Sequence, residues 1–310
     1  MSDEEWKRFY EENPPPNGLL EVKAQIVRFC NYHISMENNV VLITSGGTSV
    51  PLEHSTVRFV DNFSAGNRGA ASAEYFLRAG YAVIFMHRTK SLEPFLRHVS
   101  PAELLESSVP TKDELGNWNV KVEGDVCKQL VPLIDEYKKI KENNMMLKIE
   151  FTTLSTYLHM LYIAAQALRS MGRDAILYLA AAVSDFYIPQ KDMAVHKISS
   201  DEALNLTLNV VPKMLQPLVR YWIPDAYIVS FKLETNPDIL LSKARGALEK
   251  YGHKLVIANE LHNRKQKVVF VTKEDEQHIV LSEEDLNQGK EIEETIIKEL
   301  IIRYLQFKST

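Results

Sequence analysis

The sequence predicts an α/β fold with a single doubly wound, mostly parallel sheet flanked by helices, a Rossmann-like variant. Short uninterrupted apolar runs are typical of strands covered on both faces, and amphipathic helical segments lie between them. Apolar residues make up 45% and charged residues 25% of the 310 positions, which are ordinary values for a globular chain. Because strands alternate with helices, we expect right-handed βαβ units, with residues 1–310 forming a single domain.

The first βαβ unit is expected in the N-terminal third of the chain. An amphipathic helix at 19–33 precedes a buried strand at 40–44. The next helix is expected at 69–79, where Gly80 is placed to end it in a left-handed conformation. A second buried strand then follows at 81–86.

Residues 88–148 interrupt this regularity. Their prolines and polar stretches predict an irregular insertion, in which only 129–140 has the pattern of a helix. We expect this insertion to support dimerisation or to cover the site.

Regular alternation resumes after the insertion. Thr153 is suited to cap a helix at 154–168. Apolar and polar residues alternate at 204–210, as in a strand with one solvated face. The remaining elements are expected to be strands at 175–183, 226–231, 255–258 and 268–272, and helices at 213–221, 238–251 and 292–304.

The bulk properties exclude several functional classes. The net charge of −5 gives no electrostatic basis for non-specific nucleic-acid binding. No apolar run approaches the roughly 20 residues that a membrane span needs, and the acidic N-terminus lacks the apolar core of a signal peptide. The two cysteines, Cys30 and Cys127, are far apart, which excludes a disulfide framework and favours a reducing, cytoplasmic location.

The segment 44–69 is the richest candidate for a ligand site, because ligands of open parallel sheets bind beyond the carboxyl ends of the strands. SGGT at 45–48 follows the first strand, and NFSAGNRG at 62–69 opens the next helix. Glycines let a backbone approach a phosphate, and a helix N-terminus offers unpaired N–H donors. We therefore predict a phosphorylated ligand here, although any one of these glycines can equally serve only a turn.

Three charged residues are further candidates. Arg58 offers a planar cation for a carboxylate or a phosphate. Asp185 follows small residues at a strand end and could bind a hydroxyl, an amine or a metal-bound water, and Lys197 could pair with phosphate oxygens. Each also has an ordinary interpretation: Arg58 and Lys197 can simply be surface cations, and Asp185 can cap a turn.

Several familiar motifs are absent or broken. Neither G-x-G-x-x-G nor G-x-x-x-x-G-K-[ST] occurs, which disfavours a standard dinucleotide fold and a P-loop. Tyr187 and Lys191 match the Y-x-x-x-K of short-chain dehydrogenases, but Pro189 breaks the helix that this motif needs. No H-E-x-x-H or similar pair is present, so we expect no metal held by protein ligands alone.

Taken together, the sequence resembles the phosphopantothenate–cysteine ligase family, also called phosphopantothenoylcysteine synthetase, in its stand-alone eukaryotic form. Eight blocks in collinear order over nearly the whole chain are far more specific than one glycine motif. The blocks are SGGTSVPLE (45–53), VRFVDNFSAGNRGA (57–70), EFTTLSTYLH (150–159), YLAAAVSDFYIP (178–189), HKI (196–198), VPKMLQPLV (211–219), SFKLET (230–235) and AN (258–259).

The resemblance implies a ligase of coenzyme A biosynthesis that joins phosphopantothenate to cysteine through an amide. In the family, a nucleoside triphosphate with Mg²⁺ converts the carboxylate to an acyl-nucleotidylate and releases pyrophosphate. The cysteine amine then attacks the acyl carbon and expels the nucleoside monophosphate. The resemblance further implies a cytoplasmic homodimer, and the eukaryote-like pattern favours ATP over CTP.

The resemblance also implies roles for individual residues. Asn62 would contact the pantothenate portion and the reactive acyl centre, and it shares the expected catalytic work with Lys197, near the phosphates. The other expected substrate contacts are Ala181, Ala182, Asp185 and, from the partner subunit, Arg58. The other expected nucleotide contacts are Gly46, Ser64, Gly66, Gly69, Phe231 and Asn259.

Two departures and two alternatives remain open at this point. Bacterial relatives carry lysines where this chain has Ser199 and Ser200, and further lysines where it offers Lys243, Arg245 and Lys250. The alternatives on the same fold are an NAD(P)- or flavin-dependent oxidoreductase and a catalytically silent nucleotide-binding protein.

Overall fold

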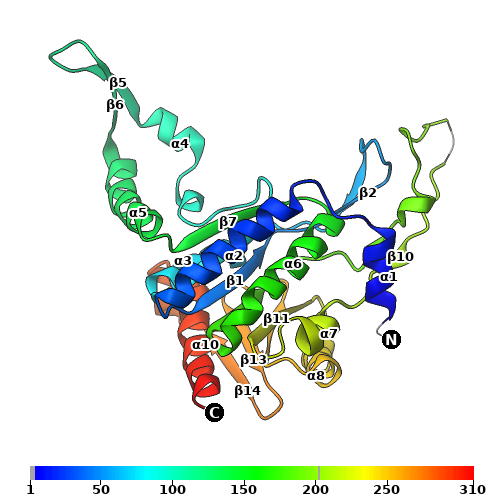
Figure 1. The fold of residues 1–310 in the computed structure, drawn as a ribbon. Helices are drawn as coiled ribbons and strands as arrows, with labels where there is room; N and C mark the ends of the chain where they lie inside the picture. Colours follow the sequence, from blue (N-terminus) through cyan, green and yellow to red (C-terminus); the bar gives the residue numbers. More distant parts are fainter. Residues whose placement is uncertain (1–3, 202) are drawn as a thin grey trace.

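The computed structural model describes residues 4–201 and 203–310, which are built around one eight-stranded sheet (Figure 1). All neighbouring pairs from β12 to β7 are parallel, whereas β12–β13 and β13–β14 are antiparallel. The predicted doubly wound, mostly parallel sheet is therefore confirmed. In spatial order the strands are β14 (Glu276–Val280), β13 (Lys267–Val271), β12 (Leu255–Glu260), β11 (Tyr227–Glu234), β8 (Ala175–Leu179), β1 (Val40–Ser45), β4 (Ala82–Arg88) and β7 (Met146–Phe151).

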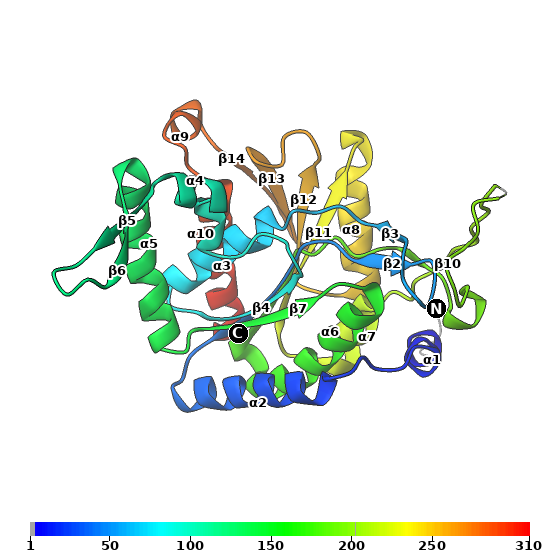
Figure 2. The same ribbon diagram turned by 90° about the horizontal axis from the view of Figure 1, so that it is seen from above.

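Helices cover both faces of this sheet (Figure 2). One core contains buried side chains of α2 (Leu19–Ser35) and α6 (Leu154–Leu168). A smaller, separate cluster forms where α8 (Leu240–Tyr251) packs on β12 and β13. The opposite core contains α3 (Asn67–Arg78) and α10 (Ile292–Ser309). None of the helices within residues 4–201 and 203–310 combines the length and apolar character that a bilayer span requires.

Local sequence signals account for several of these elements. All six residues of β1 are buried, so its continuous apolar run is the pattern of a strand covered on both faces. Gly80 has a φ of 84°, which confirms the left-handed stop after α3. The Thr153 hydroxyl accepts the N–H of Thr156 at 3.2 Å and caps α6 as predicted.

The stretch expected to be irregular, 88–148, instead carries regular elements. Two of its prolines sit where a missing N–H does little harm: Pro101 opens a helix behind a Ser100 capping box, and Pro110 lies in an isolated two-stranded hairpin, whereas Pro132 lies inside the helix Gly124–Glu142. The strand β7 escaped prediction because only Ile149 and Phe151 of its six residues are buried. The helix expected at 129–140 is confirmed as part of α5 (Gly124–Glu142), and the added elements are η1 (Leu96–His98), α4 (Pro101–Glu106), β5 (Ser108–Lys112) and β6 (Trp118–Val122).

Some other expectations were wrong or incomplete. The strand expected at 204–210 is reduced to β10 (Asn209–Val210), which pairs only with β9 (Phe186–Tyr187) outside the main sheet. The strand expected at 175–183 ends at Leu179, and beyond it Ala182 forms an isolated parallel bridge with Gly47. The helix expected at 213–221 consists of the short α7 (Leu215–Pro217) and a π-helical turn, η4 (Leu218–Trp222).

Further elements without a sequence prediction include α1 (Glu4–Glu12), α9 (Glu283–Asn287) and the edge strand β14. The helix α1 is held by aromatic contacts. Phe9 is buried and meets Tyr187 edge-on, with ring centroids 5.2 Å apart, and Trp6 meets Trp222 at 5.6 Å.

Two excursions project from the sheet and matter for the site (Figure 1). The hairpin arm, residues 48–62, contains β2 (Ser49–Pro51) and β3 (Phe59–Asp61). The second arm, residues 186–201 and 203–210, contains β9, η3 (Gln190–Asp192) and β10. The N–H of His54 donates to the carbonyl of Ala194 at 2.9 Å, so the two arms are hydrogen-bonded to each other.

Candidate active site

A cleft of about 740 Å³ lies beyond the carboxyl ends of β8, β11 and β12. Its walls come from the end of the hairpin arm, the first turn of α3, the segment 180–185 and the 211–218 region. Most of the residues proposed from the sequence line this cleft. They are Asn62, Ser64, Gly66, Ala181, Ala182, Asp185, Phe231 and Asn259.

The first turn of α3 opens directly onto the cleft. Gly66 occupies the N-cap with a φ of 85°, and among the described residues no side chain caps the turn that follows. The first N–H groups of α3 therefore remain available to an anion, whose charge the helix dipole favours. Ser45 and Ser64 brace this start, because the Ser45 hydroxyl donates to the carbonyl of Gly66 at 3.1 Å and the Ser64 hydroxyl accepts its N–H at 3.3 Å.

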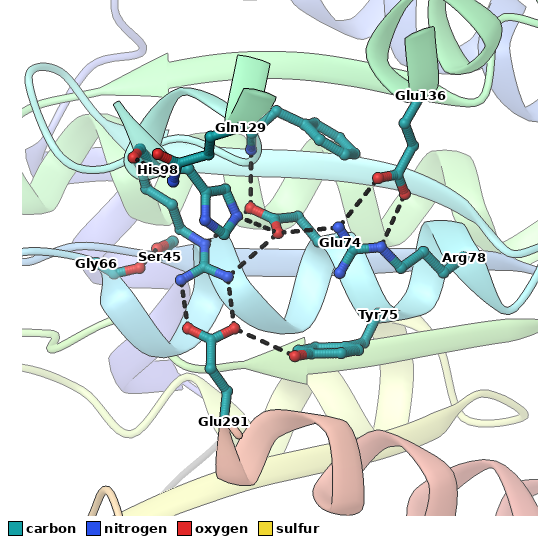
Figure 3. A network of polar contacts seen from close by, with 11 residues as sticks. Ser45, Gly66, Glu74, Tyr75, Arg78, His98, Gln129, Glu136 and Glu291 are labelled. Carbon is teal, nitrogen blue, oxygen red and sulfur yellow. Dashed lines mark hydrogen bonds and ion pairs between the residues drawn. The ribbon is translucent and has the colours of Figure 1, made fainter. Parts of the chain in front are cut away.

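An ion network centred on Glu74 holds α3, and its members do not line the cleft (Figure 3). Glu74 is fully buried and accepts from the backbone N–H of Phe95 and from the side chains of Arg97 and His98, each at 2.8 Å. Arg97 also pairs with Glu291, which precedes α10. The helix whose N-terminus faces the cleft is thus tied to two other parts of the fold.

Glycines of the 44–69 segment serve close packing more than ligand contact. A Cβ at Gly47 would lie 1.7 Å from the carbonyl oxygen of Asn62, and one at Gly69 would lie 2.5 Å from the Cβ of Ser45. Neither Gly69 nor Gly46 is among the residues that line the cleft. The close approach at Gly47 places Asn62 against the loop 45–48, and the N–H of Asn62 donates to the carbonyl of Thr48 at 3.1 Å.

Two buried threonines fix the wall formed by 180–185. The Thr44 hydroxyl accepts the N–H of Ala181 at 3.2 Å, and the Thr48 hydroxyl accepts the N–H of Ser184 at 2.9 Å. Asp185 is exposed at the mouth and pairs with Lys213, with 2.7 Å between Oδ1 and Nζ. The wall therefore offers hydrogen-bonded backbone beside one exposed carboxylate.

Another part of the cleft combines an aromatic ring with an ion pair that is largely shielded from solvent. Phe231 lines the cleft and meets Tyr178 edge-on, with ring centroids 4.9 Å apart. Arg68 Nη1 lies 2.8 Å from Glu293 Oε1, and Arg68 Nη2 donates to Asn259 Oδ1 at 3.3 Å. Burial raises the pKa of the Glu293 carboxyl, an effect that the charge of Arg68 opposes.

Arg58 and Lys197 do not line the cleft of their own chain. Arg58 precedes Asn62 by four positions of extended chain, which corresponds to about 13 Å. Arg58 pairs with Glu53 near the tip of the hairpin arm, and Lys197 is exposed on the second arm. The geometry therefore does not bring these two cations to the other candidate residues within one chain.

Comparisons with known proteins agree over nearly the full length of the chain. The family model for the DNA/pantothenate metabolism flavoprotein C-terminal domain matches residues 36–113 and 130–305. The phosphopantothenate–cysteine ligase of Mus musculus is 46% identical over 298 residues, which cover 96% of each chain. That of Homo sapiens is 45% identical with the same coverage. The chain belongs to the phosphopantothenate–cysteine ligase family.

A solved structure of a family member supports the same assignment. A Cab2 mutant in complex with phosphopantothenate-cysteine has a TM-score of 0.88 and 39% identity, and 98% of each chain is covered. The DNA/pantothenate metabolism flavoprotein from Streptococcus pneumoniae, at 21% identity and a TM-score of 0.58, shares the fold.

Sequence reasoning assigned no role to the four described cations that line the cleft, which are Arg68, Lys213, Lys232 and Arg264. Arg68 and Lys213 lie inside blocks that carry the family resemblance, but neither was assigned a role. A signal for Arg68 was present, because it stands two positions after Gly66, in the first turn of the helix predicted to meet a phosphate. No local signal pairs Lys213 with Asp185, which lies 28 residues earlier.

Proposed function

We propose that this chain condenses phosphopantothenate with cysteine and consumes a nucleoside triphosphate, with release of pyrophosphate and a nucleoside monophosphate. The observation that carries the proposal is one cleft that joins an uncapped helix N-terminus to Asn62 and the small-residue wall 180–185. The relatives named as phosphopantothenate–cysteine ligases support this function, as does the ligand in the Cab2 structure.

The nucleotide occupies the end formed by α3, β11 and β12 in this proposal. The first turn of α3 and Ser64 supply donors to phosphate oxygens, and Phe231 offers an apolar face to the base. Asn259, held by Arg68, adds a polar group beside the base. Gly46 and Gly69 then act indirectly, because they let the backbone of this loop and helix pack closely.

The acyl group lies at the other end, beside Asn62, Ala181 and Ala182. Attack of a carboxylate on an α-phosphate brings two anions together, so donors must hold them in line and offset their repulsion. The backbone of Asn62 is held by its contacts with Gly47 and Thr48, and its side-chain amide donates to the acyl oxygen as charge develops there. No nucleophilic side chain is required.

We take ATP as the co-substrate, with CTP as the alternative that the assay must compare. Among the described residues there is no group of three or more side chains suited to hold a metal ion. This donor set fits Mg²⁺ that is held mainly by nucleotide phosphates, with Asp185 as the carboxylate nearest the cleft mouth. When bound, Mg²⁺ supplies charge neutralisation at the phosphates.

The active enzyme is proposed to be a cytoplasmic homodimer of single-domain chains. Arg58 and Lys197 sit on arms outside their own cleft, so the Arg58 side chain reaches the substrate of the neighbouring subunit. The arms also expose apolar side chains that association would cover. These side chains include Val57, Phe59, Val60, Phe186, Val195 and Val210.

Turnover with two nucleotides tests the proposal. The purified protein is incubated with Mg²⁺, phosphopantothenate, cysteine and either ATP or CTP, and the amide product, pyrophosphate, AMP and CMP are measured. We expect amide and pyrophosphate in equal amounts, with AMP formed faster than CMP. ADP in place of AMP, or nucleotide binding without amide formation, contradicts the proposal, and copurified flavin or nicotinamide would favour an oxidoreductase.

A further inference from the structure

A fully buried carboxylate lies near the tip of the hairpin arm. The side chain of Glu53 has no exposed area, although Val57 and Phe59 close to it are 57% and 51% exposed. Glu53 Oε2 accepts the N–H groups of Val57 at 3.2 Å and Arg58 at 3.0 Å, and Oε1 accepts the N–H of Ile198 at 3.4 Å. Burying an ionised carboxylate is unfavourable without such partners, so this arrangement is a built site for the charge.

These contacts also settle the charge state of Glu53. The backbone N–H of Arg58 is the largest influence that lowers the pKa of the Glu53 carboxyl. Glu53 is therefore an anion at neutral pH and a permanent acceptor for its neighbours.

The same carboxylate fixes the guanidinium of Arg58. Arg58 Nη1 donates to Glu53 Oε1 at 3.1 Å and to the carbonyl of Ile198 at 2.9 Å. Within the described residues, Nε and Nη2 of Arg58 make no hydrogen bond, and 35% of the side chain is exposed. The guanidinium thus turns one edge inward and presents its other edge, a two-donor fork suited to a carboxylate or phosphate, to the outside.

We propose that Glu53 is a positioning residue for the contact that Arg58 makes with the substrate of the neighbouring subunit. The inference rests on the proposed function, because it takes phosphopantothenate as the anion that meets Arg58. An arginine side chain loses rotamer freedom when it binds, and a guanidinium already held at one nitrogen loses less. Glu53 also joins the two arms through Ile198, so the fork is fixed relative to both.

Steady-state kinetics of Glu53→Gln test the positioning role. Glutamine keeps the size of the side chain, but it loses the charge and replaces one acceptor with a donor. We expect the KM for phosphopantothenate to rise roughly tenfold or more, because a buried charge-assisted pair is broken. The KM values for ATP and cysteine should stay at their wild-type values. Glu53→Asp, which retains the charge, should recover part of the loss and serves if the glutamine variant fails to fold.

Glu103→Gln is the matched control. Glu103 also accepts a backbone N–H, that of Ser100 at 2.8 Å, but it lies in α4 and does not line the cleft. Its KM for phosphopantothenate should equal the wild-type value. An unchanged KM in Glu53→Gln, or equal increases for all three substrates, would overturn the positioning role.

Mixed dimers distinguish action across the interface from action within one chain. Glu53→Gln is coexpressed with Asn62→Asp under two affinity tags, and doubly tagged dimers are assayed at low phosphopantothenate. Each mixed dimer should hold one intact site, with Asn62 from one chain and the Glu53–Arg58 pair from the other, and give about half the wild-type rate. A rate no higher than that of the Glu53→Gln homodimer would overturn the inference.

The wild-type sample separates the two levels of failure. A wild-type protein that forms no amide, or that is monomeric in solution, refutes the proposed function and with it the inference. If the wild-type protein is active and dimeric but Glu53→Gln has an unchanged KM for phosphopantothenate, the inference is refuted and the proposed function stands.

Discussion

Replacing Arg68 with methionine should leave the Glu293 carboxylate without its ion-pair partner. The side chains of Arg68 and Glu293 are only 16% and 12% exposed and lie 2.8 Å apart. Removing one partner of such a pair costs about 3–5 kcal/mol, because the remaining charge is left without compensation. Since a domain is stabilised by only about 5–15 kcal/mol in total, this loss is large enough to measure by urea unfolding.

The loss should depend on pH in a defined direction. Burial already raises the pKa of Glu293 above its ordinary value, and removal of Arg68 raises it further. A carboxyl with a raised pKa in the folded state is best tolerated when protonated. The variant should therefore lose stability as pH rises from about 4.3 to the folded pKa, by at most about 1.4 kcal/mol per pH unit.

Unfolding free energies of the wild type and Arg68→Met at pH 5 and pH 8 provide the assay. We expect the larger deficit at pH 8. Adding Glu293→Gln to the variant should restore much of the stability and remove the added pH dependence. A deficit below about 1 kcal/mol at pH 8, or no restoration in the double variant, would show that the pair does not carry the stabilisation argued from its burial.

Three further predictions concern Thr48, Asn62 and His253. Thr48→Val leaves the N–H of Ser184 without its acceptor and should cost about 1–3 kcal/mol in urea unfolding, whereas Thr48→Ser should cost less; equal effects would contradict the hydroxyl's role. Asn62→Asp should lower kcat by about 100- to 1,000-fold with an unchanged melting temperature, and a near-normal rate would remove Asn62 from the acyl centre. Burial lowers the pKa of His253 to about 4, so the stability that its neutral form contributes should be lost as pH falls from about 6.5 to about 4. His253→Gln should flatten that part of the stability profile, and an unchanged slope would exclude His253 as its cause.

The elements that the sequence predicted well are those with a local physical cause. A strand buried on both faces, such as β1, needs a continuous apolar run, and Gly80 and Thr153 mark helix ends by their own backbone or side-chain chemistry. The edge strand β7 buries only alternate residues, so it lacked that run. The prolines of 88–148 misled because Pro101 starts a helix instead of breaking one.

The candidate site followed a similar division. The order of the apolar runs was enough to predict that Asn62, Ala181, Phe231 and Asn259 lie near one another, because the carboxyl ends of parallel strands meet at the same end of the sheet. Partners distant in sequence were not predictable. The contact between Arg68 and Glu293, for example, spans 225 positions and depends on how α10 packs against α3.

The hairpin of β5 and β6 has a practical consequence for work with this enzyme. It projects from the body away from both arms (Figure 1), and none of its residues line the cleft. The family model also skips residues 114–129, which include its turn and its second strand. A short peptide tag or a surface tether inserted at Gly116 would therefore immobilise the protein with the cleft and the arms left free, as single-molecule or surface-based turnover measurements require.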